Sequence, residues 1–167
     1  MEPSTDIGKL LRYALRMEET GRDFFRENSK KFSHGGVVEI LERLASEEEK
    51  HIEFIKELIV GLERGQDFST KEDLGTGPGS FFSQRADSEK LDQTALESMI
   101  PACTVLRMAY LIERDFVDFY QKLAQRAKGK LKKALLMLSR WEREHEKFIK
   151  GYHDRLLDQY VHMPWGG

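Results

Sequence analysis

Two short motifs in this sequence place a glutamate three residues before a histidine. They are Glu48 with His51, and Glu142 with His145, and each lies in a segment with helical spacing of its apolar residues. Residues three apart share one face of a helix, so the two side chains of each motif can reach a common point. A carboxylate oxygen and an imidazole nitrogen at one point can bind a divalent metal ion.

The same chemistry extends to two more segments. When the apolar positions of each of the four segments are followed at alternating steps of four and three, each apolar stripe is interrupted by one glutamate. In two of the stripes the histidine interrupts it as well. The candidate metal ligands are therefore Glu18, Glu48, His51, Glu113, Glu142 and His145.

Acids in these positions create a charge problem that metal ions would solve. A single buried carboxylate costs several kcal/mol unless it is paired or neutralised, and no lysine or arginine lies on the stripes. Two divalent cations balance four carboxylates, and two neutral imidazoles complete the ligand set without adding charge. Oxygen and imidazole ligands suit iron and manganese, whereas structural zinc sites favour cysteine, and the chain has one cysteine, Cys103. We therefore expect two metal ions, with iron as first choice and manganese or zinc as alternatives.

Other residues near the motifs have simpler interpretations. Tyr120 follows the apolar spacing and is expected to be a core residue first and a redox neighbour second. Five acids lie off the stripes and are expected on a solvated face: Glu19, Glu47, Glu49, Glu144 and Glu146.

Four long helices must position the candidate ligands. The apolar spacing predicts helices over residues 6–30, 36–64, 101–127 and 130–161. Thr5 is the expected N-cap of the first helix, and Pro101 suits the first turn of the third, where a missing N–H is harmless. Gly129 marks the turn between the last two helices.

The connections between the helices predict how they are arranged. Short turns join the first pair and the last pair, so each pair should be an antiparallel hairpin, whereas a long crossover spans residues 65–100. Phe81 and Phe82 are expected to anchor this crossover, and residues 92–99 to form a short helix. Two hairpins and one crossover are the ferritin-like topology of an all-α four-helix bundle. We expect one domain over residues 1–167, with hairpins at 6–64 and 101–161.

The two hairpins also resemble copies of each other. Glu18 and Glu113 are 95 residues apart, and each Glu-x-x-His motif is 94 residues from the other. A repeated helix pair predicts a bundle with approximate two-fold symmetry, in which equivalent ligands meet around one axis.

Composition excludes some classes of partner. The chain has 167 residues, of which 34% are charged, yet its net charge is only −2. This balance gives no sign of binding to nucleic acid or to an anionic membrane surface. No stretch approaches the ~18 apolar residues of a membrane span, and the polar N-terminus favours a cytoplasmic location.

With these motifs the sequence resembles the rubrerythrin branch of the ferritin-like superfamily over nearly its whole length. The resemblance implies that the six candidate residues bind two irons that carboxylates bridge. We expect Glu48 and Glu142 to be the bridging carboxylates, because each shares a helix turn with a histidine. It also implies a di-iron oxidoreductase that reacts with peroxide or dioxygen, and we expect a homodimer. The alternatives are iron binding or ferroxidase storage, and a non-enzymatic metal-dependent interaction protein.

Two features depart from that family's pattern. Full-length rubrerythrins add a rubredoxin-like domain with four cysteines, whereas this chain has one, so the electron donor is expected to be a separate protein. Those peroxidases also carry an extra glutamate three residues after the ligand on the third helix. This sequence has Phe116 there, which leaves a more symmetric site of four glutamates and two histidines.

Overall fold

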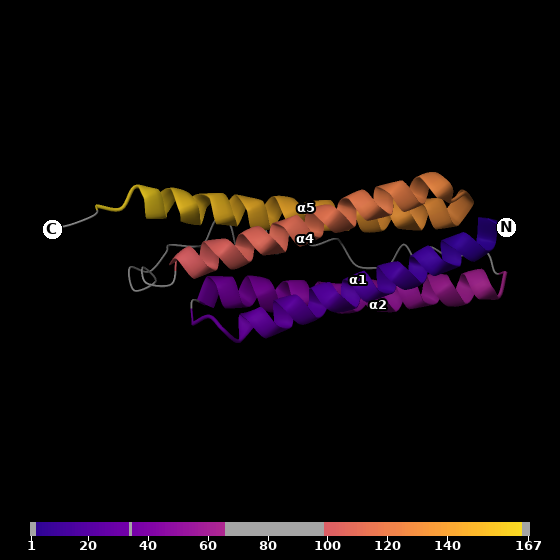
Figure 1. The fold of residues 1–167 in the computed structure, drawn as a ribbon, viewed down its shortest axis with the longest axis horizontal. Helices are drawn as coiled ribbons and strands as arrows, with labels where there is room; N and C mark the ends of the chain where they lie inside the picture. Colours follow the sequence, from indigo (N-terminus) through magenta and orange to yellow (C-terminus); the bar gives the residue numbers. More distant parts are fainter. Residues whose placement is uncertain (1–2, 34, 66–98, 165–167) are drawn as a thin grey trace.

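A computed structural model describes residues 3–33, 35–65 and 99–164 of the chain. These residues form four long helices: α1 (Pro3–Ser29), α2 (Gly35–Glu63), α4 (Met99–Arg126) and α5 (Gly129–Val161). Figure 1 shows them side by side along one direction, with the start of α1 and the end of α5 at opposite ends of the bundle. The predicted all-α four-helix bundle is confirmed.

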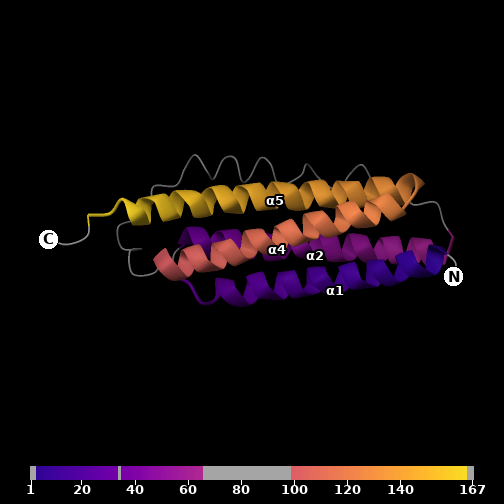
Figure 2. The same cartoon turned by 45° about the horizontal axis from the view of Figure 1, so that its top comes forward.

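The helices are packed as two hairpins. α1 packs closely on α2, and α4 packs closely on α5, while α1 also approaches α4 and α2 approaches α5. Figures 1 and 2 show that α2 and α4 run in the same direction, so the end of α2 and the start of α4 lie at opposite ends of the bundle. This is the ferritin-like topology. The crossover itself, including Phe81 and Phe82, lies outside the described residues.

The helix boundaries differ from the predicted ones by a few residues. α1 begins at Pro3 rather than Asp6, so Thr5 lies inside the first turn and is not the N-cap. Met99 is the first residue of α4, and the rest of the predicted short helix at 92–99 lies outside the described residues. Gly129 has a φ of 57°, the left-handed conformation that glycine adopts without strain, and it opens α5 directly after the turn.

The apolar core consists of two parts separated by a polar layer. One cluster includes Phe25, Leu44 and Leu106, and the other includes Leu11, Phe116 and Leu138. On every helix the candidate metal ligands lie between the residues of one cluster and those of the other. The bundle therefore holds these polar side chains at mid-length, with apolar packing on both sides.

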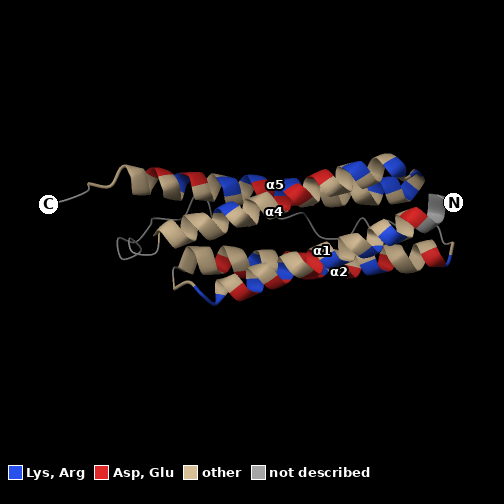
Figure 3. Ribbon diagram, in the orientation of Figure 1, with Lys and Arg blue, Asp and Glu red and all other residues tan. Residues whose placement is uncertain are grey.

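The outer faces of the helices carry charges of both signs. Figure 3 shows lysines and arginines interspersed with aspartates and glutamates along all four helices. Some of these charges form ion pairs between neighbouring helices, such as Arg22 with Glu49 and Arg114 with Glu146. None of the helices among the described residues combines the length and apolar composition needed to cross a membrane.

Candidate metal centre

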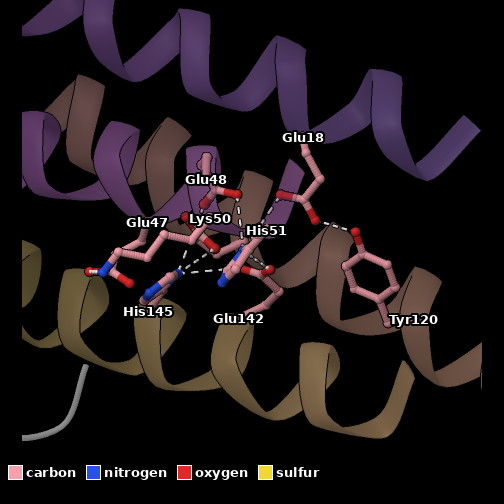
Figure 4. Close-up of polar contacts among 9 residues, drawn as sticks. Glu18, Glu47, Glu48, Lys50, His51, Tyr120, Glu142 and His145 are labelled. Carbon is pink, nitrogen blue, oxygen red and sulfur yellow. Dashed lines mark hydrogen bonds and ion pairs between the residues drawn. The ribbon is translucent and has the colours of Figure 1, made fainter. Parts of the chain in front are cut away.

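The six candidate ligands meet in the middle of the bundle. Glu18 comes from α1, Glu48 and His51 from α2, Glu113 from α4, and Glu142 and His145 from α5. His51 is 3% exposed and the other five are fully buried. Figure 4 shows the carboxylates of Glu18, Glu48 and Glu142 directed toward the two imidazole rings. The predicted set is thus brought together completely.

The ligand atoms fall into two groups, each with the size of a metal site. The first contains Glu18, Glu48, His51 and Glu142, and the second contains Glu48, Glu113, Glu142 and His145. Within each group the ligand atoms lie within 4.8 Å of one another. Glu48 and Glu142 belong to both groups. This is the arrangement that two neighbouring metal ions with two shared carboxylates require.

Distances around the histidines show the approximate two-fold symmetry. His51 Nδ1 lies 3.3 Å from a Glu48 oxygen, 2.7 Å from Glu142 and 3.7 Å from Glu18. His51 therefore contacts three glutamates: that of its own motif, that of the motif on the facing helix α5, and that on α1, the other helix of its hairpin.

The second histidine repeats this pattern. His145 Nδ1 lies 3.2 Å from Glu142, 3.9 Å from Glu48 and 3.4 Å from Glu113. The two imidazole rings are stacked, with their centroids 5.6 Å apart. The internal repeat of the sequence thus becomes a repeat of contacts in space.

Without metal, burial and neighbouring charges shift the pKa of three carboxyl groups of the site. Burial, together with the charges of Glu142, Glu18 and Glu113, raises the pKa of Glu48 well above its usual value. Burial also raises the pKa of Glu113 to about 8, although the neighbouring His145 acts in the opposite direction. Burial alone would raise the pKa of Glu142, but the two imidazoles, His51 first, lower it below its usual value.

The imidazoles respond to the same charges. Burial lowers the pKa of an imidazole, but the Glu113 and Glu142 carboxylates together outweigh burial and raise the pKa of His145 to about 9. At His51 burial also lowers the pKa, but the charges of Glu142 and Glu48 outweigh this effect. The pKa of His51 is therefore raised well above its usual value. The metal-free site therefore holds protons at neutral pH in place of metal ions.

Several carboxylate oxygens of the site take part in no hydrogen bond among the described residues. They are both oxygens of Glu48, both of Glu113, and one each of Glu18 and Glu142. Buried oxygens of this kind are rare in proteins and call for a partner such as an ion. Oxygen and imidazole donors on opposite sides of one small space fit two divalent cations, with iron and manganese preferred on ligand chemistry.

Two aromatic residues complete the site and break its symmetry. The hydroxyl of Tyr120 on α4 donates a hydrogen bond to Glu18, as Figure 4 shows. Trp141 on α5 is half-buried and stacks on His51, with centroids 5.5 Å apart and ring planes 12° apart. The sequence spacing predicted Tyr120 as a core residue but could not show its partner. The hydrogen bond joins residues of two different helices that are 102 positions apart in the sequence.

One of the acids expected on the solvated face is buried. Glu47 is only 7% exposed, so that prediction is wrong for this residue. Arg43 lies 2.9 Å from the Glu47 carboxylate, and Lys50 donates to it at 3.0 Å. These cations compensate the charge of Glu47, and Glu47 belongs to neither group of candidate ligands.

Comparison with known proteins supports the fold and shows the family of the chain. A sequence model of the rubrerythrin family matches residues 9–97, which is more than half of the chain. No curated protein matches the sequence. The fold is similar to that of a hypothetical protein from Pyrococcus furiosus, with a TM-score of 0.67 and 22% identity over 91% of this chain and 90% of the other. The matched region contains Glu18, Glu48 and His51, and the chain belongs to the rubrerythrin family.

Proposed function

We propose that this protein is a di-iron oxidoreductase that reduces peroxide or dioxygen. The observation that carries the proposal is the pair of overlapping ligand groups, which share Glu48 and Glu142. Two ferrous ions bound there would supply the two electrons that peroxide reduction requires. The family supports a metal pair at this position, and the ligand types support iron over zinc.

Each metal ion would be held by two residues of its own and by two residues that both ions share. Glu18 and His51 would hold one ion, Glu113 and His145 the other, and the two shared carboxylates would fix the spacing between them. Helices of this length, packed on both sides by apolar clusters, hold such ligands in place before metal binds. The same clusters keep bulk water away from the centre.

Tyr120 holds a proton beside the site. Burial and the charge of Glu18 raise the pKa of Tyr120 well above its usual value, so its hydroxyl stays protonated and donates to Glu18. Its counterpart in the repeat is Phe25, which has no hydroxyl. The two metal positions therefore have different surroundings, and the one next to Glu18 has a hydrogen-bond donor within reach.

We also propose that electrons come from a separate protein. Trp141 supports this idea, because its half-buried ring lies directly on the imidazole of His51. An aromatic ring in this position offers a short path from the surface between α2 and α5 to a metal ligand.

The test is a single-turnover reaction. The protein is loaded with Fe(II) without oxygen, mixed with hydrogen peroxide or, in a separate run, with dioxygen, and followed by the absorbance of ferric iron. We expect oxidation of two irons per chain, faster than that of free Fe(II) at the same concentration and pH. Oxidation no faster than in free solution would rule out the proposed function. Ferric iron that leaves the site as a growing mineral would indicate ferroxidase storage instead.

A further inference from the structure

A groove runs along the seam between α1 and α4, next to the metal centre. It has a volume of about 450 Å³. Most of its lining is apolar or aromatic and includes Tyr13, Met17, Phe24, Ile112 and Phe116. Pockets of ~300–1,000 Å³ with an apolar lining typically hold small organic molecules. The groove is thus much larger than hydrogen peroxide or dioxygen needs.

The floor of the groove is formed by the chain neighbours of two candidate ligands. Met17 and Gly21 lie one residue before and three residues after Glu18. Ile112 and Phe116 hold the same positions around Glu113. Because residues three apart share a helix face, Gly21 and Phe116 lie both in the lining of the groove and on the helix faces that carry these two carboxylates.

This side of the centre carries the fewest ligands. α1 and α4 each provide one candidate ligand, whereas α2 and α5 each provide a glutamate and a histidine. Coordination positions left free by the protein are therefore expected on the α1–α4 side. A molecule entering from the groove would approach the metals from that direction.

Phe116 packs against Gly21 where the groove meets the buried core. Gly21 and Phe116 occupy equivalent positions in the internal repeat. The position on α1 has no side chain, and the equivalent position on α4 has a large ring. A Cβ atom added to Gly21 would lie only 3.0 Å from Cζ of Phe116, so the ring occupies the space that a side chain at residue 21 would fill. Phe116 belongs to the same buried cluster as Tyr120, which binds Glu18.

The rim of the groove favours a neutral molecule. Arg16 and Asp115 carry opposite charges there, and the hydroxyl of Thr20 donates to the carbonyl oxygen of Arg16. The guanidinium of Arg16 lies over the ring of Tyr13, at 6.0 Å from its centroid. With one positive and one negative side chain, the rim has no net charge that would attract an anion or a cation.

We propose that the groove binds the apolar part of an organic hydroperoxide and that Phe116 is the gate between this groove and the metal centre. The inference rests on the proposed function and names its substrate class. In the reaction the O–O bond of the hydroperoxide breaks. The oxygen attached to carbon becomes the hydroxyl of an alcohol, and the other oxygen becomes water. Two electrons come from two ferrous ions, which become ferric, and two protons come from solvent.

Binding in the groove can be tested without any redox reaction. The probe is cumyl alcohol, the alcohol product of cumene hydroperoxide, added to zinc-loaded protein. We expect saturable NMR shifts of the methyl groups of Met17 and Ile112, which line the groove. Thr20→Phe fills the groove from its exposed rim and should weaken binding by about 10-fold. Absence of saturable shifts, or equal affinity in Thr20→Phe, would overturn the groove as the binding site.

The gate is tested with Fe(II)-loaded protein and two oxidants. Phe116→Ala should raise the oxidation rate with cumene hydroperoxide by about 10-fold more than the rate with hydrogen peroxide, because steric exclusion depends on size. Phe54→Ala is the matched control, since Phe54 is also 5% exposed and lies in the same cluster, but packs against Trp141. The ratio of the rate with cumene hydroperoxide to the rate with hydrogen peroxide is compared between the variants. An equal change of this ratio in Phe116→Ala and Phe54→Ala would overturn the role of Phe116 as a gate.

The two tests separate failure of the inference from failure of the proposed function. If iron in the site reacts with neither peroxide nor dioxygen, the proposed function fails, while cumyl alcohol still reports whether the groove binds. If hydrogen peroxide reacts and cumyl alcohol does not bind, the proposed function stands and the organic hydroperoxide is ruled out.

Discussion

Glu48 and Glu142 differ from the other candidate ligands because both groups of ligand atoms include them. We predict that Glu48→Gln weakens both metal positions, since a neutral amide replaces a shared carboxylate, whereas Glu18→Gln weakens chiefly one. Bound metal per chain, measured by elemental analysis after gel filtration, should fall from two to nearly none in the first variant and to about one in the second.

Glu47 provides a matched control for these variants. It is a buried glutamate next to Glu48, but it pairs with Arg43 and Lys50 and lies outside both groups. Glu47→Gln should keep two metals per chain. An equal loss of metal in Glu47→Gln and Glu48→Gln would mean that the substitutions act through folding and not through ligation.

Protons and metal ions compete for the same residues. Burial raises the pKa of Glu113 to about 8, and neighbouring carboxylates raise that of His145 to about 9 against the effect of burial, so the pair as a whole is protonated at pH 7 in the metal-free protein. Metal ligands must lose these protons, and the cost of doing so falls as the pH rises. We predict that Mn(II) affinity, measured by titration, rises between pH 6 and 9, by about 10-fold or more per pH unit below 8. An affinity independent of pH would contradict this account.

At the residue scale, the sequence revealed the candidate ligands but not their surroundings. The six side chains interrupt apolar stripes, and a stripe can be read from spacing alone. The hydrogen bond from Tyr120 to Glu18 and the stacking of Trp141 on His51 join different helices. The burial of Glu47 depends on how α2 is rotated in the bundle. Periodicity gives the face of a helix but not which partners that face will meet.

At the scale of elements, the turn between α4 and α5 depends on one glycine. Gly129 has a φ of 57°, where a side chain costs about 1–2 kcal/mol. No neighbouring atom lies within 4 Å of the position of an added Cβ, so backbone strain is the main effect expected. We predict that Gly129→Ala lowers the free energy of unfolding in urea by about 1 kcal/mol and leaves the metal content unchanged. An unaltered urea midpoint would contradict the strain assigned to this turn.

The helices themselves could be predicted to within a few residues, because long amphipathic segments produce a clear pattern. The positions of the helix ends were predicted less accurately. Thr5 looked like an N-cap, yet α1 begins at Pro3, and α4 begins two residues before Pro101. The close approach of Gly21 and Phe116 was not predictable, because it depends on how α1 and α4 pack across the seam.

For the whole molecule, metal binding should be linked to stability. Four buried glutamates at one level of the core disfavour the metal-free fold, and ions that bind only the folded state stabilise it. At a metal concentration of about 1,000 times Kd, the stabilisation is about 4 kcal/mol, which corresponds to roughly 10 °C in Tm for a chain of this size. Calorimetry with and without chelator measures this difference. An unchanged Tm after complete metal removal would show that the buried acids are compensated in another way.

The expected homodimer and separate electron donor stay predictions. The ferritin-like arrangement, in contrast, follows from described residues alone, because α2 and α4 run in the same direction and must be joined across the bundle.

The central claim is that six side chains bind two metal ions in one bundle. Anomalous diffraction from crystals of the Fe(II)-loaded protein, collected at the iron edge, tests it most directly. We predict two neighbouring peaks in each chain, one among Glu18, Glu48, His51 and Glu142, and the other among Glu48, Glu113, Glu142 and His145. A fully loaded crystal with no peak among these residues, or with one peak only, would contradict the account.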